Sequence, residues 1–303
     1  MSKQKNLETS HIPKINLKTI PFILLFFLRG IFEYPLPAKT VNVKKVEIKN
    51  DELKIWMIGH ASTLINFFGT TILTDPVFVK GIPFPARLVE PGLTIDRLPR
   101  IDFLLVSHAH MDHFNKPSLK KLSILVDTII IPKNCKDLLK NIIYKKIIEL
   151  DWEQETEVAG VTIKAFQPIH WGDRYPWQAH LKRGYNSYIL EKNGKTVFFC
   201  GDSGYGNFFK KLGFLFDIDI ALMPISAYSP PVFRKVHLNP EDAVLAWRDI
   251  NARYMIPIHF GNFRLSFEPL DEPARWLTNI SNKAGLSSFL KILENGKSWK
   301  LET

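Results

Sequence analysis

Hydrophobic and polar positions along the chain predict two groups of β-strands. The run at 101–106 is almost continuously apolar, as expected of a strand that is buried on both faces. The dipeptide Asn193-Gly194 separates two β-rich runs and predicts a hairpin. We expect strands at residues 54–58, 63–67, 71–74, 101–106, 161–166, 188–191, 197–200, 218–223 and 254–258.

Helix signals are sparser and lie between the strands. The segment 240–250 is the best marked, because Asn239 is a favoured N-cap and Pro240 suits the first helical position. Further helices are expected at 118–122 and 136–144. No repeat or Gly/Ser linker divides the chain, so we expect one domain at residues 43–303. Strand groups with interspersed helices predict an α/β fold of stacked sheets that helices cover.

Composition excludes several protein classes. Apolar residues make up 46% and charged residues 23% of the 303 residues, which excludes a disordered chain. No apolar run reaches the roughly 17 to 25 residues of a membrane-spanning helix, which excludes a multi-pass membrane protein. The two cysteines, Cys135 and Cys200, are too few for a disulfide framework or a four-thiolate zinc site.

Residues 1–42 are predicted to form a basic and hydrophobic arm ahead of the domain. Residues 1–50 hold nine Lys or Arg and three Glu, in a chain whose net charge is +10. Residues 19–28 are uncharged and apolar. Three interpretations stay open: a segment that lies on anionic lipid, a signal-peptide core, and an arm packed on the domain. We favour a membrane surface as partner and expect no nucleic acid, because no nucleic-acid-binding motif accompanies the charge.

Histidine and aspartate side chains follow several of the predicted strands directly. The run 107–113 reads SHAHMDH and comes straight after the strand at 101–106. His170, Asp202 and His259 follow the strands at 161–166, 197–200 and 254–258. The ends of such strands meet at one edge of a layered α/β fold, and imidazole and carboxylate groups are zinc ligands. The sequence therefore predicts a metal site at that edge.

These motifs resemble the metallo-β-lactamase superfamily. Within it, they are most similar to the branch that contains N-acyl-phosphatidylethanolamine-hydrolysing phospholipase D. The resemblance covers about residues 50–280 and rests on WMIGHAS (56–62), ILTDP (72–76), SHAHMDH (107–113), PIHW (168–171), GDSG (201–204), HLNPEDA (237–243), IHFG (258–261) and FEPLDEP (267–273). It implies a four-layer αββα sandwich.

The resemblance also implies a site with two zinc ions. One ion would be held by His108, His110 and His170, and the other by Asp112, His113 and His259. Asp202 would bridge the two ions. A hydroxide between them would attack phosphorus or an acyl carbon, a reaction that two metals can support. The residues expected to take part in catalysis are Asp112, Asp202 and His237.

Four other polar residues have competing interpretations. Asp75 is expected to accept a hydrogen bond from a ligand histidine, or else to cap the turn before Pro76. His237 is expected beside the substrate, or else in a structural role before Asn239. His60 could reach the pocket or be a buried structural histidine, so it is left out of the catalytic set. Cys200 is expected to be a core thiol.

The resemblance implies a zinc-dependent phosphodiesterase of the phospholipase D type, acting on N-acyl-phosphatidylethanolamine-like phospholipids. Residues 182–185 read KRGY and depart from the branch pattern, so a soluble lactone, thioester or small phosphodiester stays open as substrate. A binding protein with structural metals is the third alternative. The proline-rich loop 228–233 is expected to contact acyl chains or to pack as an ordinary loop. We expect a cytoplasmic, peripherally membrane-associated enzyme, with a homodimer left open.

Overall fold

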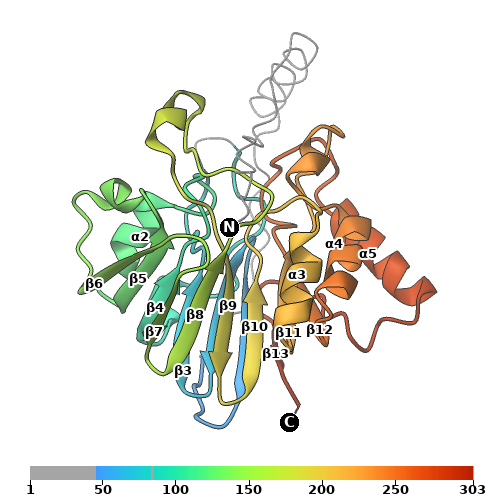
Figure 1. The fold of residues 1–303 in the computed structure, drawn as a ribbon, viewed down its shortest axis with the longest axis horizontal. Coiled ribbons are helices and arrows are strands. Elements are labelled where there is room, and N and C mark those ends of the chain that lie inside the picture. The colour runs from blue at the N-terminus through green and yellow to red at the C-terminus, as the bar shows by residue number, and fades with distance from the viewer. Residues whose placement is uncertain (1–45, 83–84, 303) are drawn as a thin grey trace, which may run out of the picture.

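The computed structural model of the protein describes residues 46–82 and 85–302. Figure 1 shows two β-sheets at the centre of the molecule with helices on either side. The predicted arm at residues 1–42 lies outside the described residues, and the domain boundary near residue 43 stays a prediction. In the part of the chain that the structure describes, no helix is long and apolar enough to cross a membrane.

Thirteen strands among the described residues form two mixed sheets. The seven-stranded sheet has the order β13 (Ser298–Lys300), β1 (Leu53–Gly59), β2 (Ser62–Phe67), β3 (Thr70–Thr74), β4 (Ile101–Leu105), β5 (Val126–Pro132) and β6 (Lys146–Leu150). The six-stranded sheet has the order β12 (Tyr254–Ile258), β11 (Ile220–Pro224), β10 (Lys195–Phe199), β9 (Ser187–Lys192), β8 (Val161–Phe166) and β7 (Glu155–Val158). Strands β1 to β3 are antiparallel, whereas β3 to β6 run parallel.

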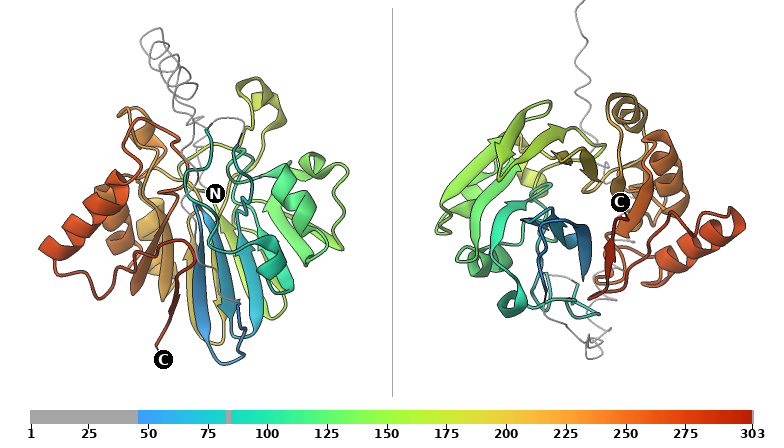
Figure 2. Two further views of the ribbon diagram at one scale, coloured as in Figure 1. Left: turned by 180° about the vertical axis from the view of Figure 1, so that it is seen from behind. Right: turned by 90° about the horizontal axis from the view of Figure 1, so that it is seen from below.

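The hydrophobic core has three large parts, one between the sheets and one on the outer face of each, and a small fourth cluster around Val77. Side chains such as Ile65, Phe103 and Tyr188 fill the space between the two sheets. The helix α2 (Lys116–Leu122) covers the outer face of the first sheet. The helices α3 (Phe208–Leu215), α4 (Pro240–Asp249) and α5 (Glu272–Lys283) cover the outer face of the second (Figure 2). The predicted αββα sandwich is confirmed.

The nine predicted strands are all present, and so are the helices α2 and α4. Asn239 caps α4, because its side-chain oxygen accepts a hydrogen bond from the Asp242 amide at 2.8 Å. The prediction of a helix at 136–144 was wrong. Only a 3₁₀ turn forms at Lys136–Leu139, and Asn141 then takes a left-handed backbone angle (φ 68°) that an α-helix does not allow.

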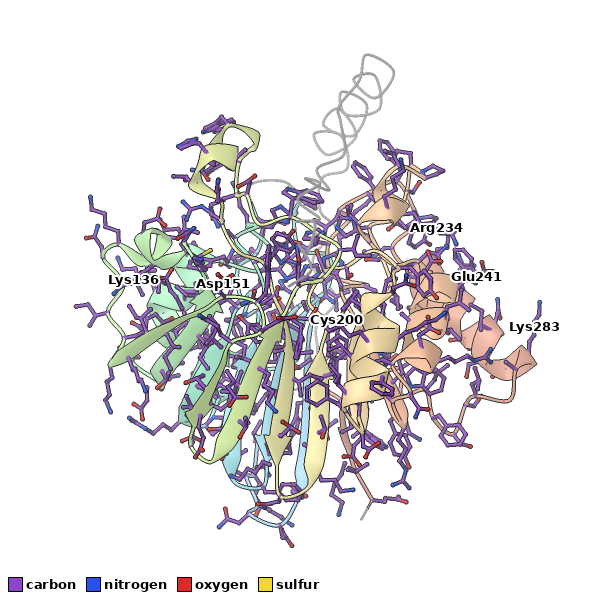
Figure 3. All side chains as sticks on the ribbon, viewed as in Figure 1. Lys136, Asp151, Cys200, Arg234, Glu241 and Lys283 are labelled. Carbon is purple, nitrogen blue, oxygen red and sulfur yellow. The ribbon has the colours of Figure 1, made fainter. Side chains whose placement is uncertain are left out.

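Several strands end at the same edge of the molecule. β4 of the first sheet and β8, β10 and β12 of the second all run toward it, which is the upper end in Figure 1. Figure 3 labels Cys200, which directly follows β10 and is buried in the apolar cluster between the second sheet and the helices α3 and α4. The connections that leave these strand ends carry the polar residues predicted from the sequence.

Candidate metal centre

The loop that follows β4 contributes four of the predicted ligands. The amides of His113 and Phe114 both donate to the His110 carbonyl, at 3.2 and 2.8 Å, and so close the loop into a tight turn. His108 and His113 are buried, and Asp112 is 14% exposed at its side chain. This turn directs histidines from one short run toward two neighbouring points.

The predicted ligands gather into two groups, each able to hold a metal ion. Within each group, one donor atom per residue lies within 4.8 Å of the others. One group is His108, His110, His170 and Asp202, and the other is His60, Asp112, His113 and His259. All seven side chains predicted as ligands therefore come together, although their roles as ligands stay predictions. The second group also includes His60.

Asp202 lies between the two groups. Its Oδ2 atom is 3.8 Å from Nε2 of both His108 and His170, and 3.2 Å from Nε2 of His113. Its Oδ1 atom is 3.3 Å from Nε2 of His259. Oδ2 therefore lies near imidazoles of both groups and Oδ1 near His259 of the second, so the carboxylate stands where a bridging ligand would.

Three of the donor atoms converge without hydrogen-bonding to one another, whereas Nε2 of His108 and Nδ1 of His110 lie at hydrogen-bonding distance, 2.7 Å apart. Among the described residues, Nε2 of His113, Nε2 of His259 and Oδ1 of Asp202 are buried and have no hydrogen-bond partner. Leaving such a group unpaired costs about 1–3 kcal/mol, so native proteins rarely do it. Nitrogen and oxygen atoms that approach to 3.2–3.3 Å without hydrogen-bond geometry fit a shared cation between them.

The charge states of Asp202 and of the first histidine group suit metal ligation. Burial alone would raise the pKa of Asp202, but His113 and His259 hold it well below its usual range, so the carboxylate stays ionised. Burial and neighbouring histidines lower the pKa of His108 well below its ordinary value. Burial lowers the pKa of His170 in the same way. Carboxylates and neutral imidazoles are the forms that bind metal. In the second group, burial would lower the pKa values of His113 and His259, but Asp202 and Asp112 raise both above the ordinary value, so these two imidazoles must lose a proton when an ion binds.

Asp75 is fully buried beneath the ligand loop, next to His113. Its Oδ2 accepts a hydrogen bond from Nδ1 of His113 at 2.6 Å, and its Oδ1 accepts one from the Ser107 amide at 2.7 Å. Donation from Nδ1 leaves Nε2 of His113 with a free lone pair toward the cluster. This contact is the one predicted from the sequence. In the same way, Nδ1 of His170 donates to the Val236 carbonyl at 3.0 Å.

His237 lies at the open side of the cluster. Its side chain is 12% exposed, and its Nε2 is 3.6 Å from Oδ2 of Asp202. The ring of Trp171 contacts those of His110 and His170, with centroids 4.7 and 4.4 Å apart. The rings of His237 and Trp171 lie side by side against the cluster, with centroids 6.2 Å apart, and a role of His237 beside a substrate stays a prediction.

His60 is the residue that sequence reasoning left out of the site. It sits in the turn between β1 and β2 with φ 58°, and Nε2 donates to Oδ2 of Asp112 at 3.0 Å. Burial lowers the pKa of His60 to about 3, so the ring is neutral. The sequence did offer a signal, because Gly59-His60 ends a strand at the same edge as the other ligands. Cys200, by contrast, packs in the apolar cluster under α3 and α4.

Two surface connections frame the site. The segment that departs from the branch pattern is anchored by Arg183, whose guanidinium pairs with both oxygens of Asp137 at 2.6 and 2.8 Å. In the second connection, buried Glu268 accepts hydrogen bonds from the amides of Ala227 and Ser229 at 2.6 and 3.1 Å. These bonds fix the base of the proline-rich loop 228–233. Both connections are held by buried charged groups. A contact of this loop with acyl chains stays a prediction.

Comparison with known proteins agrees with this architecture. The family model described as a beta-lactamase superfamily domain matches residues 70–260. An N-acyl-phosphatidylethanolamine-hydrolyzing phospholipase D of Caenorhabditis elegans is 29% identical over 90% of this chain and 82% of its own length. An uncharacterised protein of Mycobacterium tuberculosis is 28% identical over 80% of this chain and 67% of its own length.

Among solved structures, a metallo hydrolase of the archaeon Ignicoccus hospitalis superimposes with a TM-score of 0.64 at 19% identity, covering 83% of this chain and 99% of that one. This likeness concerns the fold. The family match covers the strands and loops that carry the ligand-type residues from Asp75 to His259. The chain therefore belongs to the metallo-β-lactamase superfamily of metal-dependent hydrolases.

Proposed function

We propose that the protein is a phosphodiesterase of the phospholipase D type that uses two zinc ions. The observation that carries this proposal is the position of Asp202 between two groups of buried imidazoles and carboxylates. Zinc ions bound there would supply Lewis acidity and a water molecule of lowered pKa. His108, His110 and His170 would hold one ion, Asp112, His113 and His259 the other, and Asp202 both.

The chain's own residues suit a phosphodiester at this point. His237 faces the cluster, and its buried Nδ1 has no partner among the described residues. An imidazole in that position can donate a hydrogen bond to a phosphate oxygen or to the departing alcohol. Asp112 is oriented by His60, and His113 and His259 keep the Asp202 carboxylate ionised against the effect of burial. The ring of Trp171 packs against those of His110 and His170.

The proposed substrate is an N-acyl-phosphatidylethanolamine-like phospholipid at a membrane surface. The related worm protein named above carries that activity in its name. In this chain, Trp177 is 71% exposed and its ring stacks on Tyr175 with centroids 4.8 Å apart. Both lie on the connection that leaves His170, beside exposed Lys182. Exposed aromatic and basic side chains are typical of protein surfaces that contact lipid headgroups.

The experiment is a comparison of substrates with zinc-loaded, full-length protein. N-acyl-phosphatidylethanolamine in vesicles, a simple phosphodiester and a lactone are offered separately, and the products are identified by mass spectrometry. We expect release of phosphatidic acid and an N-acylethanolamine, with Asp202→Asn inactive but folded. Turnover of the lactone or the small phosphodiester alone would overturn the phospholipid assignment. Activity of Asp202→Asn equal to the wild type would overturn the bridging role.

A further inference from the structure

Arg174 links two segments that carry metal-ligand candidates. It lies four residues after His170, on the connection between β8 and β9 that projects from the upper edge in Figure 1. Its Nη1 atom donates two hydrogen bonds, both 2.9 Å long, to the carbonyls of Ala109 and Phe114. These carbonyls belong to the ligand loop of the first sheet.

The two carbonyls have a special position in that loop. Ala109 lies between His108 and His110, which belong to the first donor group, and Phe114 directly follows His113 of the second. One nitrogen atom therefore fixes the distance between the two ends of the turn. The separation of the two donor groups depends on this distance, because His110, Asp112 and His113 lie between these points and His108 directly precedes the first.

The surroundings make these hydrogen bonds strong. Ala109 and Phe114 are fully buried, and burial lowers the pKa of Arg174, while the Tyr175 side chain and the Asp112 carboxylate act in the opposite direction. A charged donor makes a hydrogen bond roughly twice as strong as a neutral donor does. The turn itself is otherwise closed by short-range backbone bonds from His113 and Phe114.

We propose that Arg174 is a positioning residue that holds the ligand loop in its metal-binding shape and ties it to the segment of His170. It acts through the loop backbone and does not ligate metal. The proposal rests on the metal-binding part of the function proposed above. Outer groups that orient ligands typically change metal affinity by 10- to 100-fold.

The test compares Arg174→Met, which removes the donors, with Arg174→Lys, which keeps a charged donor. Lys121→Met is the control, because Lys121 is exposed on α2, the helix that follows the ligand loop. Zinc affinity is measured by competition with a chromophoric chelator, and amide hydrogen exchange is followed in the metal-free proteins. We expect Arg174→Met to bind zinc about 10- to 100-fold more weakly and to exchange faster at residues 109–115. Arg174→Lys should recover part of the zinc affinity and part of the protection from exchange, and Lys121→Met should match the wild type.

Unchanged zinc affinity in Arg174→Met would overturn the proposal, and so would faster exchange spread evenly over the whole domain. If Arg174→Met does not fold, Arg174→Lys decides, because its single ammonium must still show weaker zinc binding and faster loop exchange than the wild type. Failure of the proposed function looks different. In that case the wild type itself binds no zinc, or Asp202→Asn binds zinc as tightly as the wild type.

Discussion

Replacing Asp75 with asparagine tests how much a buried carboxylate contributes to the ligand geometry. In the native structure this carboxylate accepts three hydrogen bonds, from the Ser107 amide at 2.7 Å, the Ser107 hydroxyl at 2.5 Å and Nδ1 of His113 at 2.6 Å. The amide of asparagine has one oxygen and one NH₂ group. One of the native donors would then face another donor in a fully buried place.

These contacts set the expected losses of stability and of zinc affinity in Asp75→Asn. A buried donor left unpaired costs about 1–3 kcal/mol, and the loss of a charge-assisted bond adds to that, so we expect a loss of about 2–4 kcal/mol in the unfolding free energy of the metal-free protein. His113 is also free to take the tautomer that protonates Nε2, the atom that faces the cluster. Zinc affinity should then fall about 10- to 100-fold, or about 1.4–2.7 kcal/mol.

Asp102→Asn is the matched control. Asp102 lies on β4, the strand beside the one that precedes Asp75, and its Oδ2 accepts hydrogen bonds from the amide and the hydroxyl of Thr71 at 2.7 and 2.8 Å. Urea denaturation and chelator competition are run on both variants, and nitrogen NMR of the imidazoles reports the His113 tautomer. Equal zinc affinity in Asp75→Asn and the wild type would refute the role of Asp75 in orienting His113. If Asp75→Asn and Asp102→Asn both lose stability and neither loses zinc affinity, Asp75 contributes to folding only.

Three further predictions concern the metal, the exposed side chain of Trp177 and the ion pair of Arg183 with Asp137. Protein in zinc at a thousand times its dissociation constant is compared with protein stripped of zinc by a chelator. Removal of the zinc should lower the free energy of unfolding by about 4 kcal/mol. A thermal unfolding curve that does not change would contradict a native metal site. Trp177→Ala should weaken co-sedimentation of the protein with anionic vesicles. Phe214→Ala, which removes an aromatic ring that is 90% exposed on α3, should leave it unchanged. Equal losses in the two variants would contradict docking to the membrane through the connection that carries Trp177. Hydrogen bonds from Arg183 hold the pKa of Asp137 below its usual value. The pair therefore stabilises the folded state at pH values above the unfolded pKa of about 4. This stabilisation is lost as the pH falls through the lower pKa of the folded state. Urea denaturation of Asp137→Asn should therefore show a stability deficit at pH 7 that shrinks toward pH 3, and a deficit independent of pH would contradict the assignment.

Strands were predicted well where the sequence pattern reports burial directly. β4 and β12 are apolar runs whose side chains are mostly buried. The edge strands β7 and β13 were missed because they have no fully buried side chain and therefore no hydrophobic pattern. β5 was missed although its pattern is as apolar as that of β4, so in that case the signal was present.

Helices were predicted where capping residues mark their ends. Asn239 marks α4, whereas α3 has no side-chain cap and contains Gly213, a residue that disfavours helices. The structure gives the reason for this glycine. A Cβ atom at Gly213 would lie 2.5 Å from the Asp249 carbonyl oxygen, so close packing of α3 on the end of α4 requires glycine. Such a tertiary requirement cannot be read from local sequence.

The candidate ligands could be predicted because they follow strand ends, and so could Asp75, which follows β3 and accepts a hydrogen bond from His113. Other partners could not. His60 reaches Asp112 only because two successive positive φ angles, 130° at Gly59 and 58° at His60, turn the chain back toward the cluster. Arg174 is separated from Phe114 by 60 positions in the sequence, and nothing in its neighbourhood predicts the contact.

The distribution of the ligands over the two sheets has a consequence for stability. The first sheet supplies His60 and the loop after β4, and the second supplies His170, Asp202 and His259 after β8, β10 and β12. Each donor group contains members from both sheets. A metal ion bound by either group therefore joins the two halves of the sandwich directly above their shared core. Because ion binding and sheet packing stabilise the same arrangement, loss of the ions should weaken the whole domain together and not one loop alone.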